Sequence, residues 1–99
     1  MHKDQQSGLA RIRLTGELDL ATAEQLDRQI REVVEDGPPH VVLDLTELTF
    51  MDSTGIRLIV QWARKASSDG FTFEITQGTP AVMRVFELTG LVEQLPFRR

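Results

Sequence analysis

The stretch "VVLDLTELTFMDSTGIRLIV" (residues 41–60) contains two different apolar patterns separated by a polar loop. In its first part apolar and polar residues alternate, which is typical of a β-strand with two unlike faces. From Ile56 onward the apolar residues recur at spacings of three and four, which is typical of one helix face. The loop between the two patterns reads Asp52-Ser53-Thr54-Gly55. The stretch therefore predicts a strand, a short loop and a helix, with one carboxylate and two hydroxyls at the junction.

The same alternation of strand and helix patterns runs through the whole chain. We expect strands over residues 9–16, 40–47 and 71–76, helices over 21–36, 54–70 and 79–90, and a short edge strand within the first eight residues. The segment 91–97 is too short to classify. This order predicts a largely parallel sheet with right-handed crossovers. Because the strands alternate instead of being apolar throughout, we expect the helices mainly on one face of the sheet and the other face more exposed.

Turn and capping residues mark the ends of these elements. Gly16 is expected to end the first strand, and Gly37-Pro38-Pro39 is expected to stop the helix at 21–36. Thr22 with Gln25 could form a capping box at the start of that helix, and Asp19 is the competing cap.

Composition and charge exclude several classes of protein. The 99 residues are 40% hydrophobic and 26% charged, so we expect a single globular domain over residues 1–99. There is no cysteine and there are two histidines, His2 and His40, so no metal site is expected. The net charge of −4 argues against a binder of nucleic-acid phosphates. No apolar stretch approaches the about 20 residues of a membrane span, and the first residues lack a signal peptide's apolar centre. We therefore expect a cytoplasmic domain that neither binds nucleic acid nor inserts directly into a membrane.

The Asp-Ser-Thr-Gly loop has three interpretations. Asp, Ser and Thr are preferred helix caps, so the loop could serve only to start the helix. A nucleophilic serine is disfavoured, because His2 and His40 lie elsewhere in the chain and the pattern is not G-x-S-x-G. The third interpretation is a modified serine. A helix N-terminus would tolerate a phosphate on Ser53, which would place about −1.5 to −2 charges beside Asp52. Such a modification would change the charge of a binding face while leaving its backbone in place.

The helix that follows the loop has apolar side chains outside its core-facing stripe. Helical spacing places five residues on that stripe: Ile56, Ile59, Val60, Ala63 and Ala66. Leu58 and Trp62 lie one turn apart outside it, and their neighbours are Arg57, Gln61 and Lys65. One interpretation is an exposed apolar pair on which a partner docks beside the loop. The other is that a neighbouring loop or helix covers Trp62.

Three segments resemble the STAS domain, the fold of bacterial anti-sigma factor antagonists: "GELDLATA" (16–23), "VVLDLTELTFMDSTGIRLIV" (41–60) and "TPAVMRVFELTGL" (79–91). The resemblance covers nearly the whole chain, in order and at the usual spacing. It implies a β/α superhelix with a mostly parallel four-stranded sheet, sequential strands and helices packed mainly on one face. The chain departs from the family in two places: the segment before Leu9 is short and polar, and Arg57 stands where small residues are common in the antagonists.

For a stand-alone member, the resemblance implies a protein that binds a serine-kinase anti-sigma factor and thereby releases the sigma factor. The kinase would use ATP to phosphorylate Ser53, with Thr54 as a second acceptor position. The phosphorylated form would release the kinase, and a PP2C-type phosphatase would reset it. The expected switch loop is Asp52, Thr54, Gly55 and Asp19, and the expected partner surface is Arg57, Leu58, Gln61 and Trp62.

Two other functions are compatible with the same resemblance. The chain could be a non-switched subunit of an ABC-type lipid transporter, in which Ser53 and Thr54 only cap the helix. It could also be a regulatory domain of an anion transporter or a stressosome protein. The length and the starting Met favour a stand-alone chain, which we expect to be a monomer or weak dimer. Because there is no Gly-rich phosphate loop, we expect no cofactor, and we expect a binding protein and no enzyme.

Overall fold

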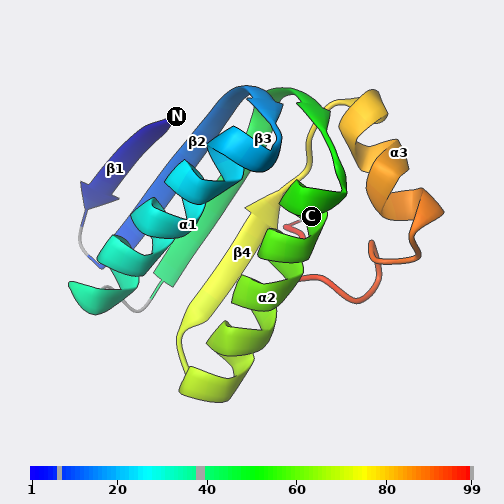
Figure 1. Cartoon of the computed structure of the whole chain (residues 1–99). Coiled ribbons are helices and arrows are strands. Elements are labelled where there is room, and N and C mark those ends of the chain that lie inside the picture. Colours follow the sequence, from blue (N-terminus) through cyan, green and yellow to red (C-terminus); the bar gives the residue numbers. More distant parts are fainter. Residues whose placement is uncertain (7, 38–39, 99) are drawn as a thin grey trace.

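Four strands form one sheet in which the spatial order follows the chain, β1-β2-β3-β4 (Figure 1). The computed structural model describes residues 1–6, 8–37 and 40–98. Strand β1 (His2–Gln6) pairs antiparallel with β2 (Leu9–Leu18), whereas β3 (His40–Met51) and β4 (Thr72–Thr76) add in parallel. The expected mostly parallel sheet with sequential strands is confirmed, and so is the short edge strand in the first eight residues.

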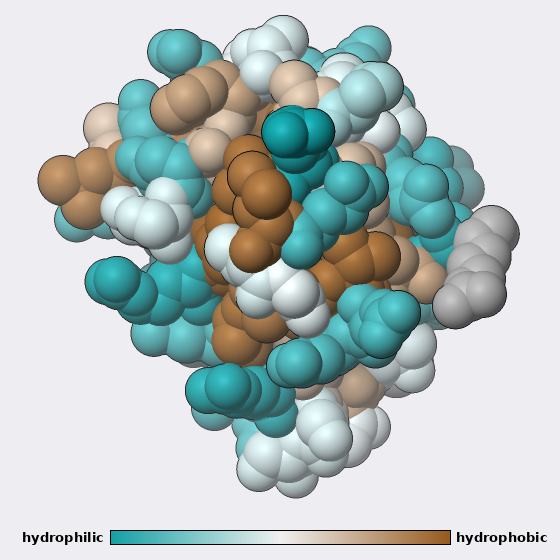
Figure 2. All heavy atoms as spheres, turned by 90° about the vertical axis from the view of Figure 1, so that its right-hand side faces the viewer, coloured by the Kyte–Doolittle hydropathy of each residue, from teal (hydrophilic) through white to brown (hydrophobic). Residues whose placement is uncertain are grey.

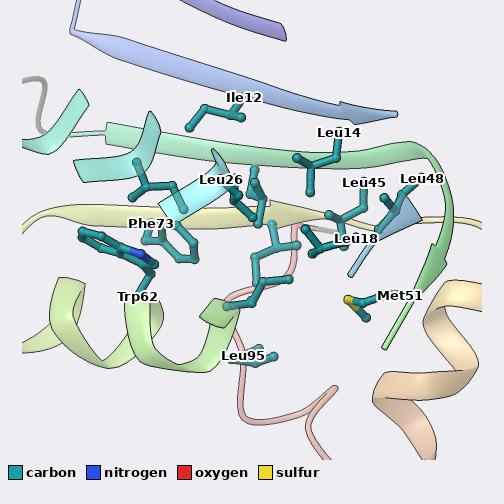
Figure 3. Close-up of a cluster of buried hydrophobic side chains, with 14 of the residues drawn as sticks. Ile12, Leu14, Leu18, Leu26, Leu45, Leu48, Met51, Trp62, Phe73 and Leu95 are labelled. Atoms are coloured by element: carbon teal, nitrogen blue, oxygen red, sulfur yellow. The ribbon is translucent and has the colours of Figure 1, made fainter. Parts of the chain in front are cut away.

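Helices α1 (Leu20–Glu35) and α2 (Ser53–Asp69) lie across one face of this sheet, and α3 (Pro80–Leu88) contacts β3 (Figure 1). The apolar side chains between the helices and the sheet form one buried cluster (Figure 3). Fully buried members from each layer include Ile12, Leu26, Leu43, Ile59 and Phe86. The one-sided arrangement inferred from the alternating strands is confirmed.

Two strands are longer than their sequence patterns predict. Gly16 does not end β2 but lies inside it, with a φ of 74°. The pairing of β2 with β3 shifts register on both sides of this glycine, and the hydroxyl of Thr49 donates to the Gly16 carbonyl at 2.9 Å. A glycine without a Cβ can adopt this left-handed conformation at a bulge, so both strands continue past it.

The expected capping box of Thr22 with Gln25 is wrong, and the competing cap Asp19 is confirmed. The Asp19 carboxylate accepts from the N–H groups of Ala21 and Thr22, both at 3.1 Å. In return, the Thr22 hydroxyl accepts from the Asp19 N–H at 2.8 Å. The first helix therefore begins at Leu20 and ends at Glu35. Pro38 and Pro39, expected to stop it, lie outside the described residues.

The face of the sheet away from the helices is less exposed than the alternation predicts. Val42 is fully buried on it, and Asp44 is only 6% exposed. The strand register places Val42 between Arg11 and Glu74, whose long side chains flank it. A hydrogen bond also links His40 to Glu74 across the strands. Charged side chains of neighbouring strands therefore cover this face, which the sequence pattern could not indicate.

The C-terminal segment runs beside the free edge of β4. The Ile75 N–H donates to the Pro96 carbonyl at 3.0 Å, and the Arg98 N–H donates to the Ile75 carbonyl at 2.7 Å. Phe97 packs edge-on against Phe86 of α3, with ring centres 5.0 Å apart. Figure 2, which views the molecule from the side of α3, shows apolar atoms gathered in the middle of this face. The tail thus fixes α3 against the sheet.

Candidate functional site

The Asp-Ser-Thr-Gly loop lies where β2 and β3 end side by side. Leu18 pairs with Met51 at the ends of the two strands, and the Asp52 N–H donates to the Leu18 carbonyl at 3.2 Å. Helices α1 and α2 start directly after these strand ends. The parallel pairing of the strands therefore brings the two helix starts together.

An aspartate caps each of these two helix starts. The Asp52 carboxylate accepts from the Thr54 N–H at 2.9 Å and from the Gly55 N–H at 3.3 Å, and Asp19 does the same for α1. Hydrogen bonds from Thr22, first through its backbone and then through its hydroxyl, lower the pKa of Asp19 below its ordinary value. Both carboxylates expected in the switch loop thus lie at this end of the sheet.

Ser53 is the first residue of α2 and is exposed to solvent. Among the hydrogen bonds of the described residues, the Ser53 side chain takes part in none, because Asp52 already accepts from the helix N–H groups. The interpretation of the loop as a helix cap is confirmed for Asp52, whereas the alternative in which Ser53 and Thr54 cap the helix is wrong. Thr54, which the resemblance suggests as a second acceptor position, is half-buried. The structure leaves the Ser53 hydroxyl open for chemistry on its oxygen.

Gly55 is present at this loop because there is no room for a side chain. A Cβ at this position would lie 2.7 Å from Leu18 Cδ2 and 2.9 Å from Met51 Cγ. Such distances are shorter than van der Waals contact, so α2 approaches the strand ends closely only with glycine there. This close approach places Ser53 next to the C-terminal ends of β2 and β3.

A groove of about 310 Å³ lies between α1 and α2 beside Ser53. Its lining includes apolar, cationic and acidic side chains: Leu20, Ala23, Glu24, Asp27, Arg31, Thr54, Arg57, Leu58 and Gln61. Three of the four residues expected at the partner surface, Arg57, Leu58 and Gln61, thus lie together along this groove. The groove offers an apolar floor with charges of both signs around it.

The expectation that Trp62 forms an exposed pair with Leu58 is wrong. Trp62 is only 5% exposed, and its Nε1–H donates to Asp27 Oδ1 at 2.9 Å. Figure 3 shows its indole rising from α2 toward the sheet among the buried apolar side chains. Helix α1 covers the Trp62 side of α2, whereas Val60 and Ala63, expected in the core stripe, line a separate hollow of about 500 Å³. Trp62 is therefore linked to the groove through Asp27, which is one of the residues that line it.

Sequence reasoning missed two exposed apolar side chains at the same end of the molecule. Leu20 is 71% exposed at the first position of α1, and Phe50 is 50% exposed near the end of β3. Leu20 directly follows the capping Asp19, and a large apolar residue at such a helix start could have indicated a surface role. Phe50 carried no such signal, because it continues an alternating strand.

Within residues 1–6, 8–37 and 40–98, no group of three or more His, Asp or Glu side chains is placed to hold a metal ion. In that same part of the chain, none of the helices has the length and apolar character needed to cross a membrane.

The structure combines a one-sided β/α sheet with an exposed serine at the start of α2, beside the groove between α1 and α2. The chain belongs to the STAS domain family: the family model described as "Mlab, STAS domain" matches residues 1–96. The fold and the sequence thus agree on the family that the three quoted segments indicate.

The chain is similar to several proteins of known role or structure. An anti-sigma F factor antagonist of Paenibacillus polymyxa is 31% identical over 90 residues, which span 90% of this chain and 77% of the relative. A crystal structure of an anti-sigma factor antagonist from Mycobacterium paratuberculosis is 30% identical, with a TM-score of 0.85 over 97% of this chain and 81% of that one. The structure of SpoIIAA in its unphosphorylated form is 25% identical, with a TM-score of 0.82 over 99% of this chain and 87% of that one. These names favour the antagonist interpretation over a transporter subunit.

Proposed function

We propose that this protein is an anti-sigma factor antagonist whose binding is switched off by phosphorylation of Ser53. It would bind a cytoplasmic anti-sigma factor that is also a serine kinase, and the sigma factor would be released. The kinase would transfer the γ-phosphoryl group of ATP to Ser53 Oγ, with loss of the hydroxyl proton and release of ADP. A PP2C-type phosphatase would remove the phosphate by hydrolysis. The protein itself would act as a binding partner and substrate, with no catalytic role and no cofactor.

The observation that carries this proposal is the free, exposed hydroxyl of Ser53 directly after a capping aspartate. Because Asp52 and not Ser53 caps α2, a phosphate can be added without the loss of a helix cap. The names of the similar proteins support the class of function. SpoIIAA, one of these proteins, is described in its unphosphorylated form, which supports phosphorylation as the kind of switch.

Electrostatics gives the reason why a phosphate here would end binding. The modification adds about −1.5 to −2 charges to a surface that already carries Asp19 and Asp52 at adjacent helix starts. A partner surface that fits a neutral hydroxyl would have to bury this charge next to two carboxylates. The helix N-terminus tolerates the phosphate, so the fold would persist while affinity falls.

The partner surface we propose is the groove between α1 and α2, which includes the exposed side chain of Leu20. Leu20 and Leu58 would supply the apolar contacts, and Arg57 and Gln61 the polar ones. Clusters of apolar anchors with a polar rim are the usual source of binding energy at protein interfaces. Trp62 would hold the groove in shape without touching the partner.

Mapping the phosphate tests the proposal directly. The protein is incubated with ATP and the anti-sigma kinase obtained by pull-down with unmodified protein, and the product is analysed by mass spectrometry. We expect one phosphate on Ser53, with Thr54 as the fallback acceptor. Phosphate mainly on Ser67 or Ser68, which lie at the far end of α2, would overturn the assignment.

A further inference from the structure

Arg57 lies one helical turn after Ser53 on α2 and is exposed. It lines the groove between α1 and α2, but within the described residues it makes no ion pair. The groove's other cation, Arg31, is already engaged, because its guanidinium donates to Asp27 Oδ2 at 2.8 Å. Arg57 is therefore the cation in this groove that has no carboxylate partner among these residues.

Helix geometry places this cation within reach of the serine oxygen. Residues four apart in a helix are surface neighbours, with Cβ atoms about 5–6 Å apart. Helical side chains also lean toward the N-terminus, so the Arg57 side chain can reach the turn that contains Ser53. A guanidinium binds phosphate through charge-assisted, often bidentate hydrogen bonds.

We propose that Arg57 is the intramolecular counter-ion of a phosphate on Ser53, so that phosphorylation draws its guanidinium out of the α1–α2 groove. This inference rests on the proposed phosphorylation of Ser53. The modification then changes two features together: it adds negative charge at the helix start, and it removes a cation from the surface that a partner would contact. The second change is specific to this chain's residue at position 57.

Phosphorus NMR measures this pairing without any partner protein. Phosphoserine is installed at position 53 during translation through an expanded genetic code, and the ³¹P shift is titrated from pH 4 to pH 8. A cation beside the phosphate favours the dianion and lowers its second pKa, which is about 6 for phosphoserine. The variant Arg57→Gln should therefore raise this pKa by about 0.2–0.4 unit, as expected for one pair of residues four apart in a helix.

The matched control is Arg64→Gln, which removes the same charge from the same helix about 10 Å farther along its axis. It should shift the pKa by less than about 0.1 unit, because salt screens charges at that distance. The carboxylates that face the site, Asp19, Asp52 and Glu24, and the cation Arg31 are present in both variants, so their effects cancel. Equal titrations of the two variants would overturn the inference.

A second readout follows the guanidinium itself. The Arg57 Nε–H resonance should move and exchange more slowly with water when position 53 carries phosphoserine, and the Arg64 resonance should not. An unchanged Arg57 resonance would show that it remains in the groove, against the proposal. Because the phosphoserine is installed without a kinase, these outcomes are separate from the mapping experiment. A kinase that ignores Ser53 would end the proposed function, yet the titration would still report on Arg57.

Discussion

At the start of α2, the side chain of Asp52 forms hydrogen bonds within the described part of the chain, whereas the side chain of the adjacent Ser53 does not. Asp52 accepts hydrogen bonds from two backbone N–H groups of the first helical turn. The carboxylate therefore stabilises the helix, and the hydroxyl is left for another role. A proposed modification of Ser53 would therefore leave the cap of α2 in place.

Exchange of each residue for alanine tests this difference. Asp52→Ala should lower the free energy of unfolding by about 0.5–2 kcal/mol, because a helix cap is lost. Ser53→Ala should stay within about 0.5 kcal/mol of the parent, as for most exposed residues. Urea unfolding followed by circular dichroism measures both. A larger decrease in the free energy of unfolding for Ser53→Ala than for Asp52→Ala would show that the serine caps the helix.

Charge at position 53 should control affinity for the kinase. Ser53→Ala cannot be phosphorylated and should bind constitutively, whereas Ser53→Asp places a carboxylate at the same surface. A carboxylate carries about half the charge of a phosphate. We therefore expect a loss of affinity of about tenfold or more for Ser53→Asp, or ~1.4 kcal/mol. Calorimetric titration of both variants against the anti-sigma kinase decides the question, and equal affinities would argue against a charge switch.

Among the helices, α1 and α2 are joined by a hydrogen bond between residues far apart in sequence, in addition to their apolar packing. The Trp62 indole donates to Asp27 Oδ1, and Asp27 also accepts from Arg31. Asp27 thereby links the packing of α2 to the charges that line the groove. This network helps to hold the two helices together and so stabilises the shape of the groove between them.

Truncation of the indole should therefore destabilise the fold. Trp62→Ala should lower the free energy of unfolding by about 3–5 kcal/mol, since it removes a large buried side chain and leaves Asp27 Oδ1 without its donor. The neighbouring variant Gln61→Ala, on the exposed side of the same helix, should change stability by about 0.5 kcal/mol or less. Chemical denaturation measures both. A free energy of unfolding that is unaffected by Trp62→Ala would contradict the buried position.

The exposed leucine at the start of α1 should contribute to partner binding. Leu20→Ala should weaken affinity for the anti-sigma kinase about fivefold or more, as expected for an apolar anchor worth ~1 kcal/mol. Leu88→Ala is the matched control, because Leu88 is similarly exposed, at 74%, but lies on α3 outside the groove. Surface plasmon resonance with both variants compares them. Equal losses from the two would place the interface elsewhere.

At the scale of the whole molecule, a network of charged side chains covers the face of the sheet away from the helices. Burial alone would raise the pKa of Asp44, but hydrogen bonds from Thr46 and Thr76 and the charge of Arg11 hold it below its ordinary value. Glu74 is also buried in part, and hydrogen bonds from Arg98 and His40 lower its pKa. These carboxylates connect β2, β3, β4 and the C-terminal segment.

This network predicts the response of the fold to acid. A carboxylate with a lowered pKa in the folded state stabilises the fold above its unfolded pKa, about 3.9 for Asp, and this contribution is lost as pH falls toward the folded value. Asp44→Asn should be less stable than the parent at pH 7, and the difference should shrink between about pH 5 and pH 3. Urea unfolding at several pH values measures it. A difference that stays constant with pH would show that ionisation of Asp44 does not stabilise the fold.

The order of strands and helices, the one-sided packing and the position of the Asp-Ser-Thr-Gly loop could all be predicted from the amino-acid sequence. These features follow from local signals: alternating apolar residues in strands, helical spacing in the helices, and capping residues at their starts. The same signals distinguish a sheet with helices on one face from a sheet with helices on both faces. Strands that are buried on both faces are apolar throughout, and these strands alternate.

The surroundings of individual side chains, in contrast, could be known only once the chain was folded. Trp62 is buried in the apolar cluster, and its indole nitrogen bonds Asp27, which lies 35 residues away in the sequence. Ser53 is free because the strand ends hold Asp52 where it can reach the helix N–H groups. Val42 is covered because the strand register places Arg11 and Glu74 on either side of it. Each depends on residues brought together by the fold, and a local pattern carries no information about such distant neighbours.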